Sequence, residues 1–232
     1  MTEFNFHTVA IVHSCYKEKF GIPRQSGLSL SAEATIELIP PYNQEDYVRE
    51  LEGFSHIWVV FIFHQHLNIE AKATVRPPRL GGNKRIGVFA SRSPFRPNPV
   101  GLSAVKLNKV TVENKKVILH VSGADFIDNT PVIDIKPYIN YADSIPDAQS
   151  SYANTAPANV LNIIFLEAAN RAINDNLTDY PDLKNLIHET ISLDPRPAYI
   201  NDTNKEYGLN LYDFNIRWRV KENIAEILAI ES

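Results

Sequence analysis

The 232-residue sequence is poor in cysteine and has no long apolar run. Its single cysteine, Cys15, excludes an internal disulfide framework and any zinc site built on cysteine ligands, which points to the cytoplasm. The longest apolar stretch, residues 57–63, is far shorter than the roughly 20 residues that span a bilayer. The N-terminal stretch has an acidic residue where a signal peptide would be basic. We therefore expect no targeting segment and no membrane partner.

Several signatures of nucleotide-binding and hydrolytic enzymes are also missing. The sequence has no GxGxxG, no Walker loop, no GxSxG elbow and no HExxH. His64 and His66 form an HxH pair that could share one face of a strand, but no third ligand is near them in sequence. We therefore predict no metal site. The regular strand–helix alternation of a doubly wound parallel sheet is absent as well.

Acidic residues are absent between residues 71 and 112, although the chain has a formal net charge of −4. Nine basic residues fall in this stretch, so the rest of the chain must sum to −13, since −4 minus +9 is −13. In RPPRLGGNKRIGVFASRSPFRPNP, arginines alternate with Pro, Gly and Asn rather than following helical or strand spacing. Guanidinium groups on rigid loops predict an anion-binding surface; the alternative is a solvated basic face.

The first half of the chain is rich in β-branched and aromatic residues. One short helix is expected, capped by Asn43 and running through Tyr47, Val48 and Leu51. We predict a mainly β N-terminal domain, built as an antiparallel sheet or barrel. The expected strands cover residues 4–13, 35–39, 56–63, 85–90, 100–107, 116–122 and 131–135.

The composition changes after Tyr138, where Pro, Asp, Ser, Asn and Ala dominate without an apolar period, as in a linker or an extended surface strap. Residues 158–177 and 182–192 then show the spacing of amphipathic helices. In DFNIRWRV, apolar residues alternate with polar ones, which predicts a strand with one core face and one face bearing two guanidinium groups. We predict a first domain at 1–145 and a small α+β domain at 146–232.

Two short motifs place polar groups on turns. Asp125 leaves a strand end after Gly123, where it could hold a ribose hydroxyl or simply cap a turn. In DPRPAY, two prolines favour an extended, exposed Arg196 beside Tyr199, which suits phosphate contact and base stacking. The alternative for DPRPAY is an Asp-Pro turn between a helix and a strand.

Longer strings make the sequence similar to a known family. YKEKFGIPRQSGL, RPPRLGGNKRIGVFASRSPFRPNP, GLSAVKL, TPVIDIKPY, DPRPAY and FNIRWRV together resemble the TrmO family, also called the TsaA-like or YaeB family. The resemblance covers essentially the whole chain. It implies an S-adenosylmethionine-dependent methyltransferase that acts on N6 of threonylcarbamoyladenosine, the modified base beside the anticodon of tRNA. It also implies a single non-Rossmann β-barrel, used as a dimer, with a small C-terminal domain.

The resemblance further implies which residues form the site. Ser26 stands where family members commonly have Pro, and the segment that holds Asp125 varies in the family. The implied cofactor-binding residues are Gln25, Ser26, Gly27, His64, Gln65, Arg92, Leu102, Ala124, Asp125 and Phe126. Candidates for catalysis are Arg92, Arg96 and Asn98, and candidates for tRNA contact are Arg79, Arg196, Tyr199, Arg217 and Arg219.

Two other functions compete with this interpretation. A non-catalytic module could bind S-adenosylmethionine or a nucleotide as a regulatory ligand, although it would not need two separate arginine surfaces. A phosphate-handling hydrolase would use the arginines, but the sequence has no carboxylate-rich metal site near them. Arg79 and Arg96 are the candidates for pairing with the free carboxylate of the threonyl group, because guanidinium binds carboxylate in a bidentate manner.

Overall fold

The computed structural model describes residues 3–157, 160–196 and 205–232. They divide into two compact units. The first unit holds the chain up to His13, Ala34–Ser122 and Asn129–Asn154; the second holds Ser14–Glu33, Gly123–Asp128 and the chain from Thr155 onward. The predicted division is a single cut after residue 145. The two units depart from it because two short segments of the N-terminal half group with the C-terminal part.

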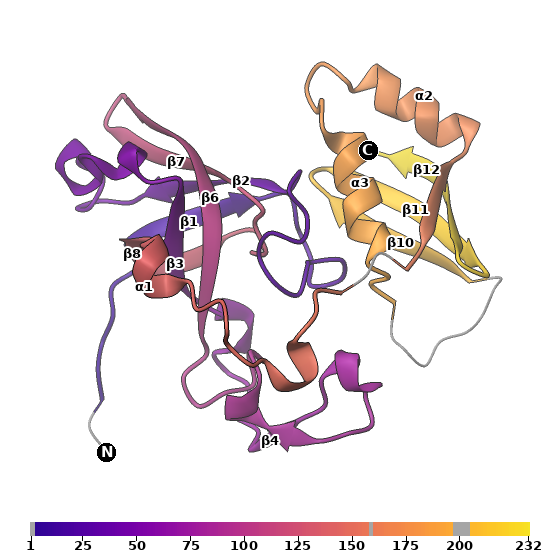
Figure 1. Cartoon of the computed structure of the whole chain (residues 1–232). Coiled ribbons are helices and arrows are strands. Elements are labelled where there is room, and N and C mark those ends of the chain that lie inside the picture. Colours follow the sequence, from indigo (N-terminus) through magenta and orange to yellow (C-terminus); the bar gives the residue numbers. More distant parts are fainter. Residues whose placement is uncertain (1–2, 158–159, 197–204) are drawn as a thin grey trace. The chain divides into compact units, whose positions relative to one another are not determined.

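Six strands of the first unit close into a barrel, drawn in indigo to magenta in Figure 1. Around the barrel they are β1 (Ala10–Ser14), β2 (Glu33–Leu38), β7 (Lys116–Ser122), β6 (Val100–Glu113), β3 (His56–Ile62) and β8 (Thr130–Pro137). The pairs β1–β8, β3–β8, β3–β6 and β6–β7 are antiparallel. The predicted β-rich barrel is confirmed.

Alternating side chains of these strands fill the barrel, and in β6 this alternation ends at Leu107. In β7, Val117, Leu119 and Val121 are buried, and in β3, Ile57 and Val59 are buried. Successive side chains of a strand point to opposite faces, so this alternation places one face inside and one outside. The period-2 pattern of the sequence therefore specifies which residues form the core.

A close contact joins β3 to β6 at the point where β6 begins. Gly101 lies opposite Phe61 in the register of the two strands. A β-carbon on Gly101 would fall 2.2 Å from the Phe61 ring, so a larger residue would displace the ring. Glycine at this strand position serves the close approach of an aromatic side chain.

Two predicted strands of the first unit are shorter than expected. The strand expected at 4–13 begins only at Ala10. The strand expected at 85–90 is the two-residue β5 (Ile86–Gly87) followed by a 3₁₀ turn at Val88–Ala90. β5 pairs with β4 (Thr74–Val75) in a small separate hairpin. Closely spaced Pro and Gly limit regular structure here.

The helix expected after Asn43 is wrong in type. The chain instead forms two 3₁₀ turns, Glu45–Val48 and Leu51–Gly53. Glu50 between them has a φ of 65°, in the left-handed region, which ends the first turn. Asn43 does not cap a helix; its side-chain Nδ2 donates to the Lys115 carbonyl at 2.8 Å.

An extended strap follows β8, as the composition predicts. Its regular elements are α1 (Asn140–Asp143) and a 3₁₀ turn at Ser151–Ala153. The Tyr152 hydroxyl donates to the carbonyl of Ala90 at 3.1 Å. This hydrogen bond ties the end of the strap to the loop that follows β5.

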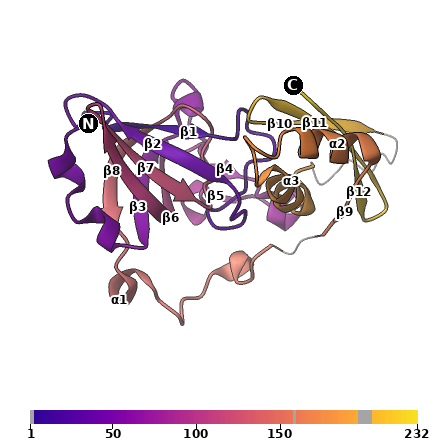
Figure 2. The same cartoon turned by 90° about the horizontal axis from the view of Figure 1, so that it is seen from above.

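The second unit is a four-stranded sheet with two helices packed on it, shown from above in Figure 2. In order across the sheet the strands are β10 (Glu206–Leu211), β11 (Phe214–Lys221), β12 (Ile224–Glu231) and β9 (Asn162–Phe165). The helices are α2 (Glu167–Asp175) and α3 (Leu183–Ser192). Leu186 and Ile187 of α3 share one buried cluster with Leu209 and Trp218 of the sheet.

The predictions for this unit hold for α3 and β11 and fail for part of 158–177. α3 covers the helix expected at 182–192, and β11 alternates buried and more exposed residues as expected. The helix expected from residue 158 is wrong over β9, which pairs in parallel with β12. Leu161, Ile163 and Phe165 fit a strand as well as a helix, and pairing with a distant strand decides between them.

The segment that begins at Ser14 belongs to the core of the second unit. Cys15 and Tyr16 are fully buried, and the Tyr212 amide donates to the Cys15 carbonyl at 2.7 Å. Gly21 has a φ of 89°, and a β-carbon there would lie 2.2 Å from Leu209 Cδ1. The sequence just before the PRQSG loop is thus fixed against β10.

Candidate functional site

The His64-Gln65 motif lies in a 3₁₀ turn, His64–His66, directly after β3. A row of rings runs from it: Phe63 meets His66 at 6.4 Å between centroids, and His66 meets Phe95 at 5.0 Å. The Lys72 ammonium lies 4.3 Å from the centre of the Phe95 ring. These ring contacts place the FHQH turn (Phe63–His66) beside the SPF segment (Ser93–Phe95), about 30 residues later in the sequence.

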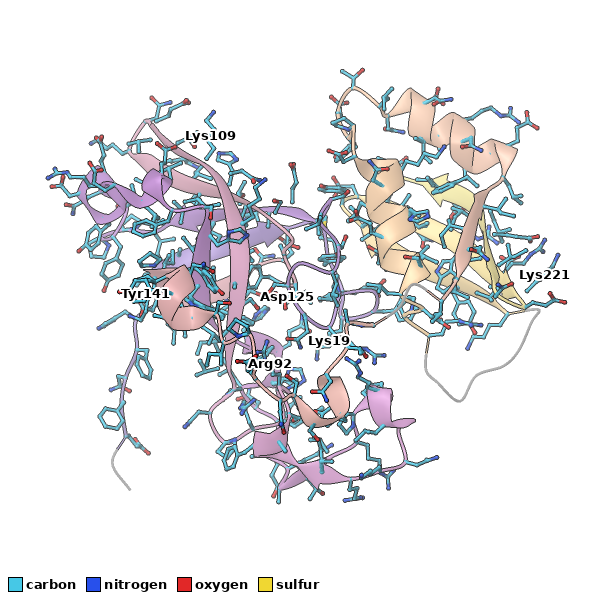
Figure 3. The ribbon with its side chains drawn as sticks, in the orientation of Figure 1. Lys19, Arg92, Lys109, Asp125, Tyr141 and Lys221 are labelled. Carbon is cyan, nitrogen blue, oxygen red and sulfur yellow. The ribbon has the colours of Figure 1, made fainter. Side chains whose placement is uncertain are left out.

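The SPF segment is braced by its own polar groups. The Ser91 hydroxyl donates to the Val88 carbonyl at 2.8 Å. Arg96 Nη1 donates to the carbonyls of Ser91 and Ser93 at 3.3 and 3.4 Å. Arg92 is exposed on this braced loop and is labelled in Figure 3. Arg96 therefore fixes the loop on which Arg92 is exposed. The Nε and Nη2 atoms of Arg96 take no part in these two hydrogen bonds.

Leu102 and Asn98 complete the predicted cofactor-binding and catalytic residues of the first unit. Leu102 is 51% exposed on β6, because its neighbours Gly101 and Ser103 face the barrel interior. Asn98 is exposed, and its carbonyl accepts from the Val100 amide at 2.7 Å. The first unit thus carries His64, Gln65, Arg92, Arg96, Asn98 and Leu102 on the FHQH turn, the SPF loop and the start of β6.

The other predicted cofactor residues lie in the second unit, on two segments that contact each other. The Gly27 amide donates to the Gly123 carbonyl at 2.8 Å, and the Ala124 amide donates to the Ala32 carbonyl at 3.1 Å. A β-carbon on Gly123, which has a φ of 73°, would lie 3.2 Å from Gly27 Cα. These bonds bring Gln25–Gly27 next to 124–126.

Within 124–126 the side chains differ in exposure. Ala124 and Phe126 are 1% exposed, so both residues are almost completely buried. Asp125 lies between them, half-buried, and is labelled in Figure 3. The Ser14 hydroxyl donates to the Phe126 carbonyl at 2.8 Å, which fixes the segment.

The basic residues of 72–85, here called the basic arm, are exposed around the β4–β5 hairpin. Among the residues that the structure describes, no carboxylate forms an ion pair with Lys72, Arg76, Lys84, Arg85 or Arg96. Arg85 Nη1 donates to Thr74 Oγ1 at 3.2 Å across the hairpin. Arg79 lies in a 3₁₀ turn, Pro78–Leu80, of the same arm. The arm keeps the positive charge that the sequence indicates.

Within DPRPAY, Arg196 is not exposed as the two prolines suggest. Arg196 forms a bidentate pair with Asp194, Nε to Oδ1 at 2.7 Å and Nη2 to Oδ2 at 2.8 Å. Its side chain is only 15% exposed. The expectation of an exposed Arg196 is therefore wrong, because the neighbouring carboxylate holds it. Tyr199 lies outside the described residues.

The arginines of FNIRWRV are also ion-paired. Arg217 pairs with Glu206 and Glu231 on the adjacent strands, and Arg219 pairs with Glu226 at 2.7 Å. Lys221, labelled in Figure 3 at the end of β11, lies 3.6 Å from Glu226. The outward face of this sheet is balanced in charge, with three cations and three carboxylates in these pairs.

The described residues contain no group of three or more His, Cys, Asp or Glu that could hold a metal ion. Within the same part of the chain, no helix is both long and apolar enough to cross a membrane.

The sequence motifs do not include one polar residue with a clear structural role: Glu189 of α3, which accepts hydrogen bonds from Ser29 and Ser31. Nothing in the sequence links positions so far apart.

Comparisons with known proteins agree across the chain. The model of the tRNA-methyltransferase O N-terminal domain matches residues 11–144, and that of the TrmO C-terminal domain matches residues 158–232. The chain is 48% identical to a tRNA (adenine(37)-N6)-methyltransferase of Escherichia coli, covering 100% of this chain and 99% of that protein. It is 40% identical to a putative S-adenosylmethionine-dependent methyltransferase, RcsF, of Pseudomonas aeruginosa over 90% of each chain.

A solved structure gives the same result. The chain matches the crystal structure of TrmO from Pseudomonas aeruginosa at 31% sequence identity with a TM-score of 0.84, covering 100% of this chain and 99% of that one. Sequence and structure thus agree from the barrel to the C-terminal sheet, and the chain belongs to the TrmO family.

Proposed function

We propose that this chain is an S-adenosylmethionine-dependent methyltransferase that methylates N6 of adenine 37 in tRNA. The observation that carries this function is the match of both TrmO domains, at 48% identity to a relative of that activity over the full chain. Threonylcarbamoyladenosine is the substrate base in this proposal, as the resemblance implies. We assign cofactor binding to two sets of residues, one on the FHQH turn, the SPF loop and β6, the other on 25–27 and 124–126.

The described residues fit S-adenosylmethionine at several points. Gly27 has a φ of 77°, and a β-carbon there would meet nothing within 4 Å, so its face is open to a ligand. Gln65 is exposed and offers a donor and an acceptor together, which suits the edge of an adenine ring. The exposed face of Leu102 adds apolar surface, as expected of a pocket for a small organic molecule.

When bound, S-adenosylmethionine supplies the methyl group together with its own leaving group, because the sulfonium departs as a neutral thioether. The reaction breaks the bond from methyl carbon to sulfur, forms the bond from that carbon to N6, and releases the N6 proton. The main task of the chain is therefore orientation of cofactor and base. Arg92 serves this task from a loop held rigid by Arg96 and the serine hydroxyls.

Arg96 and Arg79 are our candidates for the threonyl carboxylate. Arg96 donates through Nη1 to backbone carbonyls, which leaves its Nε and Nη2 edge for a bidentate anion. A site built for an anion rejects an analogue that lacks it, because the guanidinium would be left unpaired. We therefore expect tRNA with unmodified adenosine to be a poor substrate. Equal methyl-transfer rates on tRNA with and without threonylcarbamoylation would remove this role.

For the RNA, we propose that the anticodon stem-loop is the bound region and that the basic arm contacts its phosphates. Cationic side chains such as Arg76, Lys84 and Arg85, which form no ion pair with a carboxylate of the described residues, release counterions when they meet phosphate, and this gives affinity that depends on salt. A homodimer, which the family resemblance implies, and a cytoplasmic location, which the single cysteine favours, complete the proposal.

The rival function is a non-catalytic module that binds S-adenosylmethionine as a regulatory ligand. Mass analysis of tRNA from a strain without this gene separates the two, because only the methyltransferase predicts loss of one methyl group from the base beside the anticodon. Purified protein should restore that methyl group to the same tRNA in vitro. Unchanged tRNA in the deletion strain would favour the regulatory module.

One variant tests the cofactor assignment directly. Arg92→Ala should weaken S-adenosylmethionine binding about tenfold or more, as expected when a charged hydrogen bond of roughly 1.5–3 kcal/mol is removed. Isothermal titration in the presence of a chelator measures this affinity and, for the wild type, tests the expected independence from metal. Loss of wild-type binding on chelation would contradict the proposal.

A further inference from the structure

Glu189 of α3 is a half-buried carboxylate that holds a loop about 160 positions earlier in the sequence. One oxygen, Oε2, accepts from the Ser29 hydroxyl at 2.9 Å and from the Ser31 amide at 2.9 Å. Ser29 is 1% exposed, so its hydroxyl has little access to water. Hydrogen bonds to an ionised acceptor are stronger than neutral ones, and the two converge on one atom.

Ser29 and Ser31 end the loop that carries Gln25–Gly27. Asp194 follows α3 by two residues, and its amide donates to the Ile191 carbonyl at 3.0 Å. Desolvation lowers the pKa of the Arg24 guanidinium, and the negative charge of Asp194 opposes that shift. Glu189 therefore holds the far end of the loop, and the charge of Asp194 acts on Arg24 at its near end.

Movement of this loop would reach the second cofactor segment as well. The Gly27 amide is hydrogen-bonded to the Gly123 carbonyl, and the Ala124 amide to the Ala32 carbonyl. These two bonds link the backbone of 25–32 to that of 123–124. Both glycines have positive φ and their backbones approach closely, which leaves little room for the pair to adjust independently. A support that fixes Ser29 and Ser31 thus fixes the backbone of both segments.

We propose that Glu189 is a positioning residue for cofactor binding, and that the C-terminal α+β domain thereby serves the methyl donor. This inference rests on the proposed function, in which 25–27 and 124–126 contact S-adenosylmethionine. Glu189 does not touch the cofactor in this proposal; it acts through Ser29 and Ser31.

The test compares three variants of the full-length protein at α3. Glu189→Ala removes the acceptor, Glu189→Gln keeps one neutral acceptor oxygen, and His188→Ala changes an exposed neighbour on the same helix. Isothermal titration gives the Kd for S-adenosylmethionine, and a binding assay gives the Kd for tRNA. Steady-state rates supply KM for S-adenosylmethionine and kcat separately, and thermal melts report folding.

Glu189→Ala should raise the Kd and KM for S-adenosylmethionine about tenfold, while kcat and the Kd for tRNA change less than about twofold. Glu189→Gln should recover most of the affinity, and His188→Ala should match the wild type. If Glu189→Ala does not fold, Ser29→Ala takes its place, with an expected rise of about threefold in the Kd for S-adenosylmethionine because one of the two bonds remains.

Two results would overturn the inference. One is a folded Glu189→Ala, or a folded Ser29→Ala in its place, with wild-type affinity for S-adenosylmethionine. The other is an equal loss of affinity for cofactor and tRNA, which would mean a general structural role. A wild-type protein that fails to bind S-adenosylmethionine would instead overturn the proposed function itself, so the two failures are distinguishable.

Discussion

The basic arm of the first unit and the outward face of the second unit's sheet both carry motif arginines, but their surroundings differ. On the sheet, Arg217 and Arg219 are held by glutamates of neighbouring strands. On the arm, Arg76 and Arg85 have no carboxylate partner among the described residues. The arm can therefore offer charge to an RNA phosphate, whereas the sheet must first break existing pairs. Arginine count alone does not identify an RNA-binding surface.

The largest expected effect separates these two surfaces by tRNA affinity. The triple variant Arg76→Ala, Lys84→Ala, Arg85→Ala should weaken tRNA binding about a hundredfold or more, because each charged hydrogen bond to phosphate is worth roughly 1.5–3 kcal/mol. The salt dependence of binding should become shallower in the same variant. Its log–log slope should fall by about 0.7 for each single-stranded phosphate that the variant no longer neutralises.

The matched control removes the same number of cations from the sheet. Arg217→Ala, Arg219→Ala, Lys221→Ala should weaken tRNA binding less than about threefold when measured at the same ionic strength, because these cations already have carboxylate partners. A comparable decrease in both triple variants would break the comparison and return the sheet to the RNA interface that the sequence suggests.

The second effect distinguishes the two units by their response to alkaline pH. Burial raises the pKa of the Cys15 thiol to about 12, above the 9.0 of an exposed thiol, and burial raises the pKa of Tyr16 as well. The unfolded chain loses the thiol proton first, so stability is fully present below pH 9 and is lost as pH rises toward 12. The free energy of unfolding of the second unit should fall by about 1.4 kcal/mol per pH unit in that window.

Fluorescence can follow this unit alone, because Trp58 lies in the first unit and Trp218 in the second. In a Trp58→Phe background, urea titrations between about pH 8 and pH 10 report on the surroundings of Trp218. Cys15→Ala should remove the thiol's part of the slope. A slope that persists unchanged in Cys15→Ala would show that another group causes the alkaline loss.

The smallest expected effect compares one ion-paired arginine of the sheet with one arginine of the arm that has no carboxylate partner among the described residues. The hydrogen bond from Arg219 lowers the pKa of Glu226 below 4.5, so this pair contributes stability above pH 4.5 and loses it as pH falls below that value. Arg219→Ala should lower the Tm slightly at about pH 7 and leave it unchanged near pH 3. Arg85→Ala on the arm should leave the Tm unchanged at both pH values, and an equal decrease in both variants would contradict the difference in pairing.

Local patterns in the sequence predict much of the fold and little of the pairing. The alternation of apolar and polar residues locates β3, β7 and β11 closely, because every second side chain of a strand lies on its buried face and is apolar. β6 continues to Glu113, six residues past the predicted end at 107, because its exposed distal half is held by pairing with β7 rather than by apolar alternation. The sequence over β9 is also misread as a helix, because what makes it a strand is its pairing with β12. That strand is about 60 residues away, so a local pattern does not reveal it.

The site shows the same division. His64, Gln65 and Arg92 come from motifs and lie on turns and loops that the structure describes, where their cofactor role stays a prediction. The neutralised state of Arg217 depends on strand register, which places Glu206 and Glu231 on either side of it. Register follows from tertiary contacts, so the sequence motif FNIRWRV cannot reveal whether its arginines are available.

The interleaved course of the chain has a consequence for engineering and for proteolysis. A fragment ending near residue 154 would contain every strand of the barrel, but it would leave Cys15, Tyr16 and Ala32 without the apolar side chains that bury them. Such a fragment should therefore aggregate or be digested through its 14–33 stretch even if the barrel closes. Fusing a different C-terminal module would require a new hydrophobic partner for that stretch, not merely a longer linker.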